Sequence, residues 1–163
     1  MGEKIWNLIE TICRAIFTFG FRLIRREISE DQMNGLMQFV KFGIVGVSNT
    51  LISTFTYMIC VGIFGWHRQV GNLLGFVISV CNSFYWNNKY VFEGSRKSIS
   101  ELLFAFIKMT LSYASTGLVL GAILLELWVQ IFHIPELIAP IVSLFVTIPL
   151  NFVLNKLWAF KKK

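Results

Sequence analysis

The sequence predicts an all-α membrane protein in which four transmembrane helices form two parallel helix-hairpin repeats, preceded by an N-terminal amphipathic interfacial helix. The chain of 163 residues is 55% hydrophobic and only 15% charged, with a mean hydropathy of +0.65. Soluble domains carry about 25% charged residues, so this composition argues against a cytosolic enzyme. Long apolar stretches follow one another along the chain, and motifs of the first half recur in the second.

Residues 1–32 form an N-terminal segment with a helical period. Its apolar side chains recur at intervals of three and four, at Ile5, Ile9, Ile12, Ile16, Phe19 and Leu23. Polar and basic side chains follow the same period on another face, at Asn7, Thr11, Arg14, Thr18, Arg22 and Arg25. This spacing predicts an amphipathic helix that lies in the membrane interface with its arginines facing anionic lipid headgroups. The alternative is an ordinary helix folded against the rest of the protein.

Residues 37–163 form the predicted transmembrane domain. Crossing a hydrocarbon core of about 30 Å takes about 20 mostly apolar helical residues. Four stretches qualify, at residues 39–64, 70–92, 102–127 and 137–160, and none has a charge in its middle. Because the connections are short, neighbouring helices should run antiparallel in an up-down-up-down bundle.

Basic residues are distributed unevenly about these spans. Of the 15 Lys and Arg residues, only Arg68 falls on the side opposite the two termini. The positive-inside rule therefore predicts that both termini are cytoplasmic. Orientation and contact with anionic lipid account for the net charge of +6, and no nucleic-acid partner is expected.

Two motifs occur twice in the chain. The run SFYWNNKYVF at 83–92 aligns with NFVLNKLWAF at 151–160, and FVKF at 39–42 aligns with FIKM at 106–109. An even number of crossings separates the copies, so the repeat is parallel and not inverted. The repeat places a lysine at the cytoplasmic end of every span, and we predict a phosphate site formed by Lys41, Lys89, Lys108 and Lys156.

Amides and aromatic rings accompany these lysines. We predict a sugar site or polar seam at Asn49, Asn82, Asn87, Asn88, Asn151, Asn155, Trp86, Tyr90 and Trp158. Thr50, Ser53 and Ser79 would extend the seam across the membrane. Amides can bind sugar hydroxyls, and unsatisfied polar groups are costly at membrane depth. Other roles stay open, because end-of-helix lysines can snorkel, aromatic residues can form an interfacial belt and asparagines can join helices.

Small residues and cysteines indicate packing. Gly71 with Gly75 and Gly117 with Gly121 fit the G-x-x-x-G spacing and predict close helix approach within the chain. The odd number of cysteines, Cys13, Cys60 and Cys81, indicates neither a disulfide framework nor a zinc site. We expect no metal and no cofactor.

The motifs KFGIVGVSNTLIS, NSFYWNNKYVF and NFVLNKLWAF together resemble the GtrA-like family of small four-span membrane proteins. The resemblance extends from about Met37 to Lys163, with Ser83 in place of the leading asparagine of the second motif. It implies flipping of a polyprenyl-phosphate-linked monosaccharide to the outer leaflet of a bacterial inner membrane. A partner membrane glycosyltransferase would then use the sugar on surface polysaccharide or teichoic acid.

Other functions are consistent with parts of the sequence. The main alternative is a non-transporting anchor or accessory subunit of a glycosyltransferase. A proton-coupled exporter of cationic drugs would need a carboxylate deep in the membrane, and the acidic residues lie in termini, loops or span ends. No nucleotide-binding G-x-x-x-x-G-K-[ST] motif occurs, and no enzymatic activity is expected. Four short helices are too few to enclose a sugar phosphate, so a homo-oligomer of at least two copies is expected.

Overall fold

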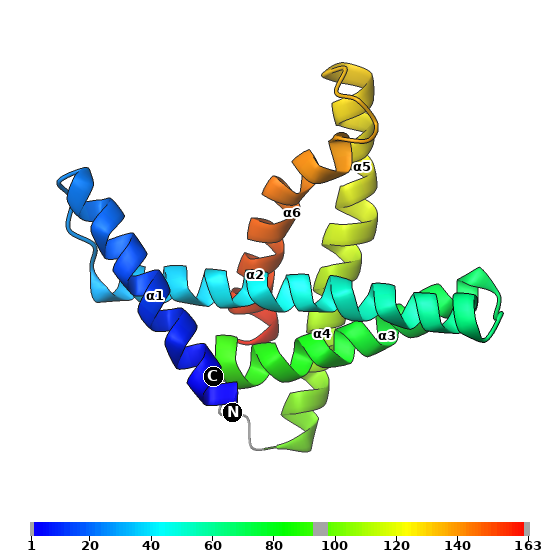
Figure 1. The fold of residues 1–163 in the computed structure, drawn as a ribbon, viewed down its shortest axis with the longest axis horizontal. Coiled ribbons are helices and arrows are strands. Elements are labelled where there is room, and N and C mark those ends of the chain that lie inside the picture. The colour runs from blue at the N-terminus through cyan, green and yellow to red at the C-terminus, as the bar shows by residue number, and fades with distance from the viewer. Residues whose placement is uncertain (1, 93–97, 162–163) are drawn as a thin grey trace.

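The computed structural model describes residues 2–92 and 98–161, and within them the chain is helical, with no strand (Figure 1). The elements in order are α1 (Gly2–Leu23), α2 (Glu30–Tyr57), η1 (Met58–Ile63), α3 (Arg68–Trp86), η2 (Asn87–Val91), α4 (Ile99–Ala114), η3 (Ser115–Leu120), α5 (Gly121–Glu126), η4 (Leu127–Ile131), α6 (Ala139–Leu154) and η5 (Asn155–Ala159). Each η segment is a π-helical turn that continues the helix before it. Four cations counted for the orientation lie outside the described residues: Arg96, Lys97, Lys162 and Lys163.

In the described part of the chain, three helices are long and apolar enough to cross a membrane: Glu30–Ile63, Ile99–Ile131 and Ala139–Ala159. They correspond to the predicted spans at 39–64, 102–127 and 137–160, and the all-helical class is confirmed. The helix that covers the predicted span 70–92 is not among them. The reason lies in its amides, Asn72, Asn82, Asn87 and Asn88, which lower the hydropathy of an otherwise apolar helix.

The helix α2 begins well before the predicted span because a capping box starts it. The backbone N–H of Gln32 donates to Ser29 Oγ at 3.3 Å, and the N–H of Ser29 donates to Gln32 Oε1 at 3.1 Å. This reciprocal arrangement satisfies two N–H groups at the start of the helix. The predicted boundary between residues 1–32 and 37–163 therefore falls inside a helix.

The backbone preserves the internal repeat. Both η2 and η5 begin at an asparagine and end against a phenylalanine. The N–H of Phe92 donates to the carbonyl of Asn87 at 2.9 Å, and the N–H of Phe160 donates to the carbonyl of Asn155 at 2.8 Å. Single π-turns inside α-helices are frequent at functional sites, and here the two copies of the repeat place one at the same point.

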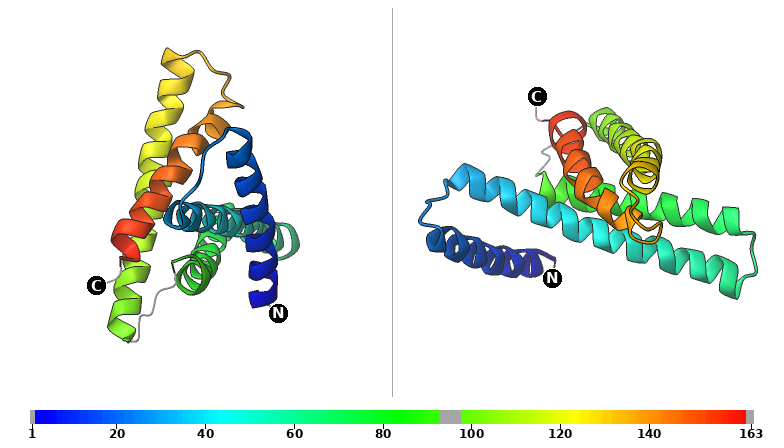
Figure 2. Two further views of the ribbon diagram at one scale, coloured as in Figure 1. Left: turned by 90° about the vertical axis from the view of Figure 1, so that its left-hand side faces the viewer. Right: turned by 90° about the horizontal axis from the view of Figure 1, so that it is seen from above.

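The long helices form two antiparallel pairs, α2–η1 with α3–η2 and α4–η4 with α6–η5 (Figure 1). The turn that joins each pair contains a residue with positive φ, 67° at Gly65 and 53° at His133. The views in Figures 1 and 2 show the pairs crossing each other instead of lying side by side along their length. This arrangement differs from the predicted up-down-up-down bundle.

Aromatic side chains fill the place where the pairs cross. The rings of Phe92 and Phe160 stack with centroids 4.8 Å apart, and Phe42 meets Phe152 edge-on at 5.6 Å. Met109, which is fully buried, completes this cluster. The two helix pairs are thus joined at their crossing by interlocking aromatic rings.

Glycines allow α2 and α3 to pack closely. A Cβ at Gly75 would lie 2.8 Å from the carbonyl oxygen of Ser53, and one at Gly71 would lie 2.8 Å from Val61 Cγ2. The predicted close approach is thus confirmed for this stripe. It is wrong for Gly117, where an added Cβ meets nothing within 4 Å, because this glycine lines a groove instead of a helix contact.

The helix α1 packs against α2 and against the end of α3. Trp6 is buried, and its ring centroid lies 6.0 Å from that of Trp86 and 5.9 Å from that of Tyr90. Glu10 and Arg14 form ion pairs that reach α2. The amphipathic helix predicted for this segment is therefore present, and one of its faces contacts the rest of the protein.

Candidate polar groove between the helix pairs

A groove of about 410 Å³ opens where the two helix pairs meet, and it is lined by α2, α3, α4, η3 and α6. Its polar lining consists of Asn49, Thr50, Ser79, Tyr113, Thr116, Thr147 and Asn151. The rest of the lining is apolar or glycine, so no lining residue carries a charge. A neutral surface that mixes hydroxyls, amides and apolar patches suits the alternating polar and apolar faces of a sugar.

Two buried asparagines lie directly behind the wall of this groove. Asn87 Nδ2 donates to the hydroxyl of Tyr113 at 3.1 Å and to Ser83 Oγ at 3.0 Å. Asn155 Nδ2 donates to Asn151, at 2.8 Å to its carbonyl oxygen and at 2.9 Å to Oδ1. Tyr113 and Asn151 both line the groove. Each repeat therefore contributes a buried amide that positions a groove-lining polar group.

The side-chain oxygens of these asparagines find no partner among the described residues. Asn87 and Asn155 are both fully buried, and Oδ1 of each accepts no hydrogen bond from residues 2–92 or 98–161. A buried polar group without a partner costs about 1–3 kcal/mol. These acceptors occupy equivalent points of the two repeats.

Asn49, Asn82 and Trp86 form a chain of hydrogen bonds between α2 and α3. Trp86 Nε1 donates to Asn82 Oδ1 at 2.9 Å, and Asn82 Nδ2 donates to Asn49 Oδ1 at 2.9 Å. Asn82 thus joins two helices by hydrogen bonds, which is the alternative role given above for the asparagines. Asn49 also lines the groove. Because Trp86 and Tyr90 pack on Trp6 of α1, the structure does not place these two rings at the groove.

The four predicted phosphate lysines lie outside the groove, each in a different environment. Lys89 Nζ lies 5.1 Å from the ring centroid of Tyr90, Lys108 Nζ lies 5.7 Å from that of Trp158, and Lys156 Nζ lies 5.6 Å from that of Phe152. Lys41 and Lys108 precede the groove-lining residues of their helices, and Lys89 and Lys156 follow them. All four lysines therefore lie towards the predicted cytoplasmic end of the groove. Asn88, also predicted for the site, does not line the groove, and its Oδ1 has no hydrogen-bond partner in the part of the chain that the structure describes.

Lys41 differs from the other lysines because it is paired with a carboxylate of α1. Its Nζ lies 2.7 Å from Glu10 Oε2, and Glu10 Oε1 lies 3.0 Å from Arg14 Nε. The hydrogen bond from Lys41, with the help of Arg14, lowers the pKa of Glu10 despite an opposing contribution from burial. An anion that binds Lys41 must therefore compete with Glu10.

We expect Glu10→Gln to loosen α1 from α2. A partly exposed ion pair contributes about 0.2–1 kcal/mol, so hydrogen–deuterium exchange of α1 should become faster by up to about fivefold. Since the pairing lowers the pKa of Glu10, the stabilisation is present above the ordinary glutamate pKa of about 4.3 and is lost as the pH falls through the lowered value.

The matched control for this experiment is Glu3→Gln, which removes an exposed carboxylate from the same helix. It should leave the exchange protection of α1 unchanged, and Glu10→Gln should abolish the acid-induced loosening of the wild type. Equal protection in the wild type and Glu10→Gln would show that the ion pair does not hold α1.

Three polar residues of the groove were not predicted from the sequence: Tyr113, Thr116 and Thr147. The repeat contained a signal for two of them. In the register that aligns Lys41 with Lys108, Thr116 corresponds to Asn49, and in the register that aligns Asn87 with Asn155, Thr147 corresponds to Ser79. No comparable signal marked Tyr113. Among the described residues, no group of three or more His, Cys, Asp or Glu side chains could hold a metal ion.

The fold and the groove define an all-helical, multi-pass membrane protein with a neutral polar site between two repeated helix pairs. Residues 41–160 match the family described as GtrA/DPMS, transmembrane domain, and the chain belongs to this family. The N-terminal helix α1 lies outside the matched region.

The chain is also similar to several bacterial and phage proteins. It is 26% identical over 137 residues to the cell wall teichoic acid glycosylation protein GtcA of Listeria monocytogenes serovar 1/2a. This alignment covers 82% of this chain and 89% of the relative. Over 77 residues it is 32% identical to the prophage bactoprenol-linked glucose translocase homolog of Escherichia coli K12 and 34% identical to the bactoprenol-linked glucose translocase of Salmonella phage P22. These two alignments each cover 47% of this chain and 64% of the relative.

Proposed function

We propose that the protein moves a polyprenyl-phosphate-linked monosaccharide from the cytoplasmic to the outer leaflet of a bacterial cell membrane. A membrane glycosyltransferase would then transfer the sugar to surface polysaccharide or teichoic acid. The observation that carries the proposal is the neutral polar groove, to which both helix pairs contribute. The relatives named as bactoprenol-linked glucose translocases and as teichoic acid glycosylation proteins support it.

In this proposal the groove takes the sugar and the lysines take the phosphate. Hydroxyl and amide groups of Asn49, Tyr113 and Asn151 replace the water that the sugar loses on leaving the headgroup region. Lys108 and Lys156 hold the phosphate at the cytoplasmic end, while Lys41 joins them when it separates from Glu10. The polyprenyl tail stays in lipid throughout, and the movement requires no nucleotide hydrolysis.

We further propose that α3–η2 crosses the membrane as a fourth span, with both termini in the cytoplasm. Hydrogen bonds from Asn82 to α2 and from Asn87 to α4 offset the cost of placing these amides in lipid. The groove is open on one side, and large apolar side chains elsewhere on the long helices are exposed. A second copy of the chain would close the groove, so the active unit is at least a dimer.

The test is reconstitution of the purified chain into vesicles with bactoprenol-linked glucose labelled in the sugar. A membrane-impermeant oxidant attacks only glucose in the outer leaflet, so protein-free vesicles retain a protected fraction. Vesicles with the protein should lose this fraction as the lipid moves between leaflets. Protection equal to that of protein-free vesicles would contradict translocation and favour the accessory-subunit alternative, which predicts glycosylation without flipping.

A further inference from the structure

We infer that the pocket between the end of α1 and the start of α2 binds the phosphate headgroup of an anionic phospholipid. The pocket has a volume of about 640 Å³ and is lined by Arg14, Thr18, Phe21, Arg22, Arg25, Arg26, Glu27, Ile28, Glu30 and Met33. It belongs to a part of the chain outside the family match at residues 41–160. The inference is therefore independent of the proposed transport function.

The arginines of this pocket are available to an anion. Arg14 is engaged with Glu10, Glu30 and Asn34. Within the residues that the structure describes, no carboxylate lies at ion-pair distance from Arg22, Arg25 or Arg26. Guanidinium groups bind phosphate oxygens in pairs, with a fixed fork of N–H donors. Three unpaired guanidiniums around one pocket fit a phosphate.

The backbone at the end of α1 gathers these arginines. Arg25 adopts a positive φ of 54°, and its N–H donates to the carbonyl of Arg22 at 3.1 Å. The next residue, Arg26, donates its N–H to the carbonyl of Phe21 at 3.0 Å. This left-handed turn, which ordinarily favours glycine, folds Arg25 and Arg26 back beside Arg22 at the pocket.

A separate stripe of α1 indicates that the phosphate belongs to a lipid. Trp6, Ile9, Cys13 and Phe17 face the protein, because they are buried or half-buried, one turn apart. A second apolar stripe is exposed, at Leu8, Ile12, Ile16, Phe19 and Leu23. Leu23, with 69% of its surface exposed, directly follows Arg22. Helices with an apolar stripe and an arginine-rich face lie in the membrane interface.

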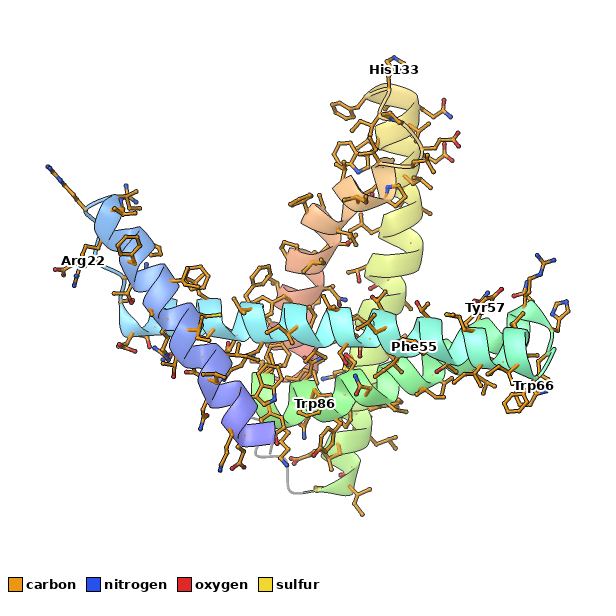
Figure 3. All side chains as sticks on the ribbon, in the orientation of Figure 1. Arg22, Phe55, Tyr57, Trp66, Trp86 and His133 are labelled. Atoms are coloured by element: carbon orange, nitrogen blue, oxygen red, sulfur yellow. The ribbon has the colours of Figure 1, made fainter. Side chains whose placement is uncertain are left out.

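The position of the pocket fits this arrangement. Figure 3 shows Arg22 at the end of α1 that lies away from Trp86 and from the crossing of the helix pairs. The exposed stripe would insert among acyl chains while the pocket meets a headgroup at the same depth. Charge complementarity favours an anionic lipid over a zwitterionic one, because the cytoplasmic leaflet attracts basic segments by about 1 kcal/mol for each Lys or Arg.

Native mass spectrometry of the full chain, titrated with phosphatidylglycerol or phosphatidylcholine, tests the inference. The wild type should retain phosphatidylglycerol preferentially, and R25Q/R26Q should weaken that binding on the order of tenfold. The matched control, K4Q/R68Q, removes two exposed cations outside the pocket and should bind within about twofold of the wild type. R25K/R26K keeps the charge but loses the paired donors, and should give an intermediate affinity.

Three results would overturn the inference. Unchanged binding by R25Q/R26Q, in protein that keeps its helical circular dichroism, would exclude the pocket. Equal losses in R25Q/R26Q and K4Q/R68Q would show general attraction to anionic lipid without a site. Competition by soluble glycerol phosphate as effective as by phosphatidylglycerol would show that the pocket takes a free phosphate, not a lipid.

Discussion

Replacing Asn87 and Asn155 together with leucine is expected to reduce translocation of bactoprenol-linked glucose about a hundredfold. Each asparagine is fully buried and holds a groove-lining group of the second helix pair: Asn87 of the first repeat holds Tyr113, and Asn155 of the second holds Asn151. A buried, hydrogen-bonded polar group contributes about 1–2 kcal/mol, so each replacement should lower the rate about tenfold. The two positions share no contact among those described, and their effects should therefore multiply.

Initial rates of loss of protected glucose in vesicles measure this effect. The matched control is Asn72→Leu, which removes an exposed amide from α3 outside the groove and should transport like the wild type. Helical circular dichroism and recovery in the vesicle fraction separate a transport defect from a failure to fold. A folded double variant with wild-type rates would show that these amides serve helix packing alone, even if the wild type translocates.

The sequence was most informative where polar residues interrupt an apolar helix. Asn87 and Asn155 stood out because amides are costly in lipid, and the structure shows both buried behind the groove wall. Their role in binding stays a prediction. The family assignment from three short motifs was confirmed by the match over residues 41–160. These features could be predicted because they depend on local sequence and on the repeat.

Features that depend on contacts between distant segments could not be predicted. No pattern in the sequence marked Glu10, and only the packing of α1 brings it to Lys41. Tyr113 had no pattern to mark it, because its hydroxyl matters only beside Ser83, 2.6 Å away on a different helix. The crossing of the helix pairs likewise follows from how phenylalanines of both pairs interlock, which hydropathy does not encode.

Gly75→Ala is expected to lower the free energy of unfolding by about 1–3 kcal/mol, the usual cost of inserting an extra methyl group into a packed contact. The added methyl carbon would lie 2.8 Å from the carbonyl oxygen of Ser53. Because this neighbour is backbone, it cannot rotate away, and α2 and α3 must separate. Gly71→Ala should cost less, since its new methyl meets the side chains of Val61 and Tyr57, which can shift.

Gly62→Ala provides a control of opposite sign. An added Cβ at Gly62 meets nothing within 4 Å, and alanine is favoured over glycine in helices by about 1 kcal/mol. Unfolding by a denaturing detergent, followed by circular dichroism, should therefore give a higher midpoint for Gly62→Ala and a lower one for Gly75→Ala. Equal shifts at the two positions would mean that helix propensity decides, and that α2 and α3 do not depend on glycine for their contact.

Destabilisation by an added methyl group should be confined to the first helix pair, because the second pair is built differently at the same positions. At the positions that correspond to Gly71 and Gly75 in the repeat, α6 carries Ala139 and Ser143, both buried. The second helix pair therefore has room for a side chain at these two positions, whereas the first pair needs glycine at both. Since α2 and α3 also form one wall of the groove, their separation in Gly75→Ala should slow translocation as well as destabilise the fold, whereas Gly62→Ala should leave the rate unchanged.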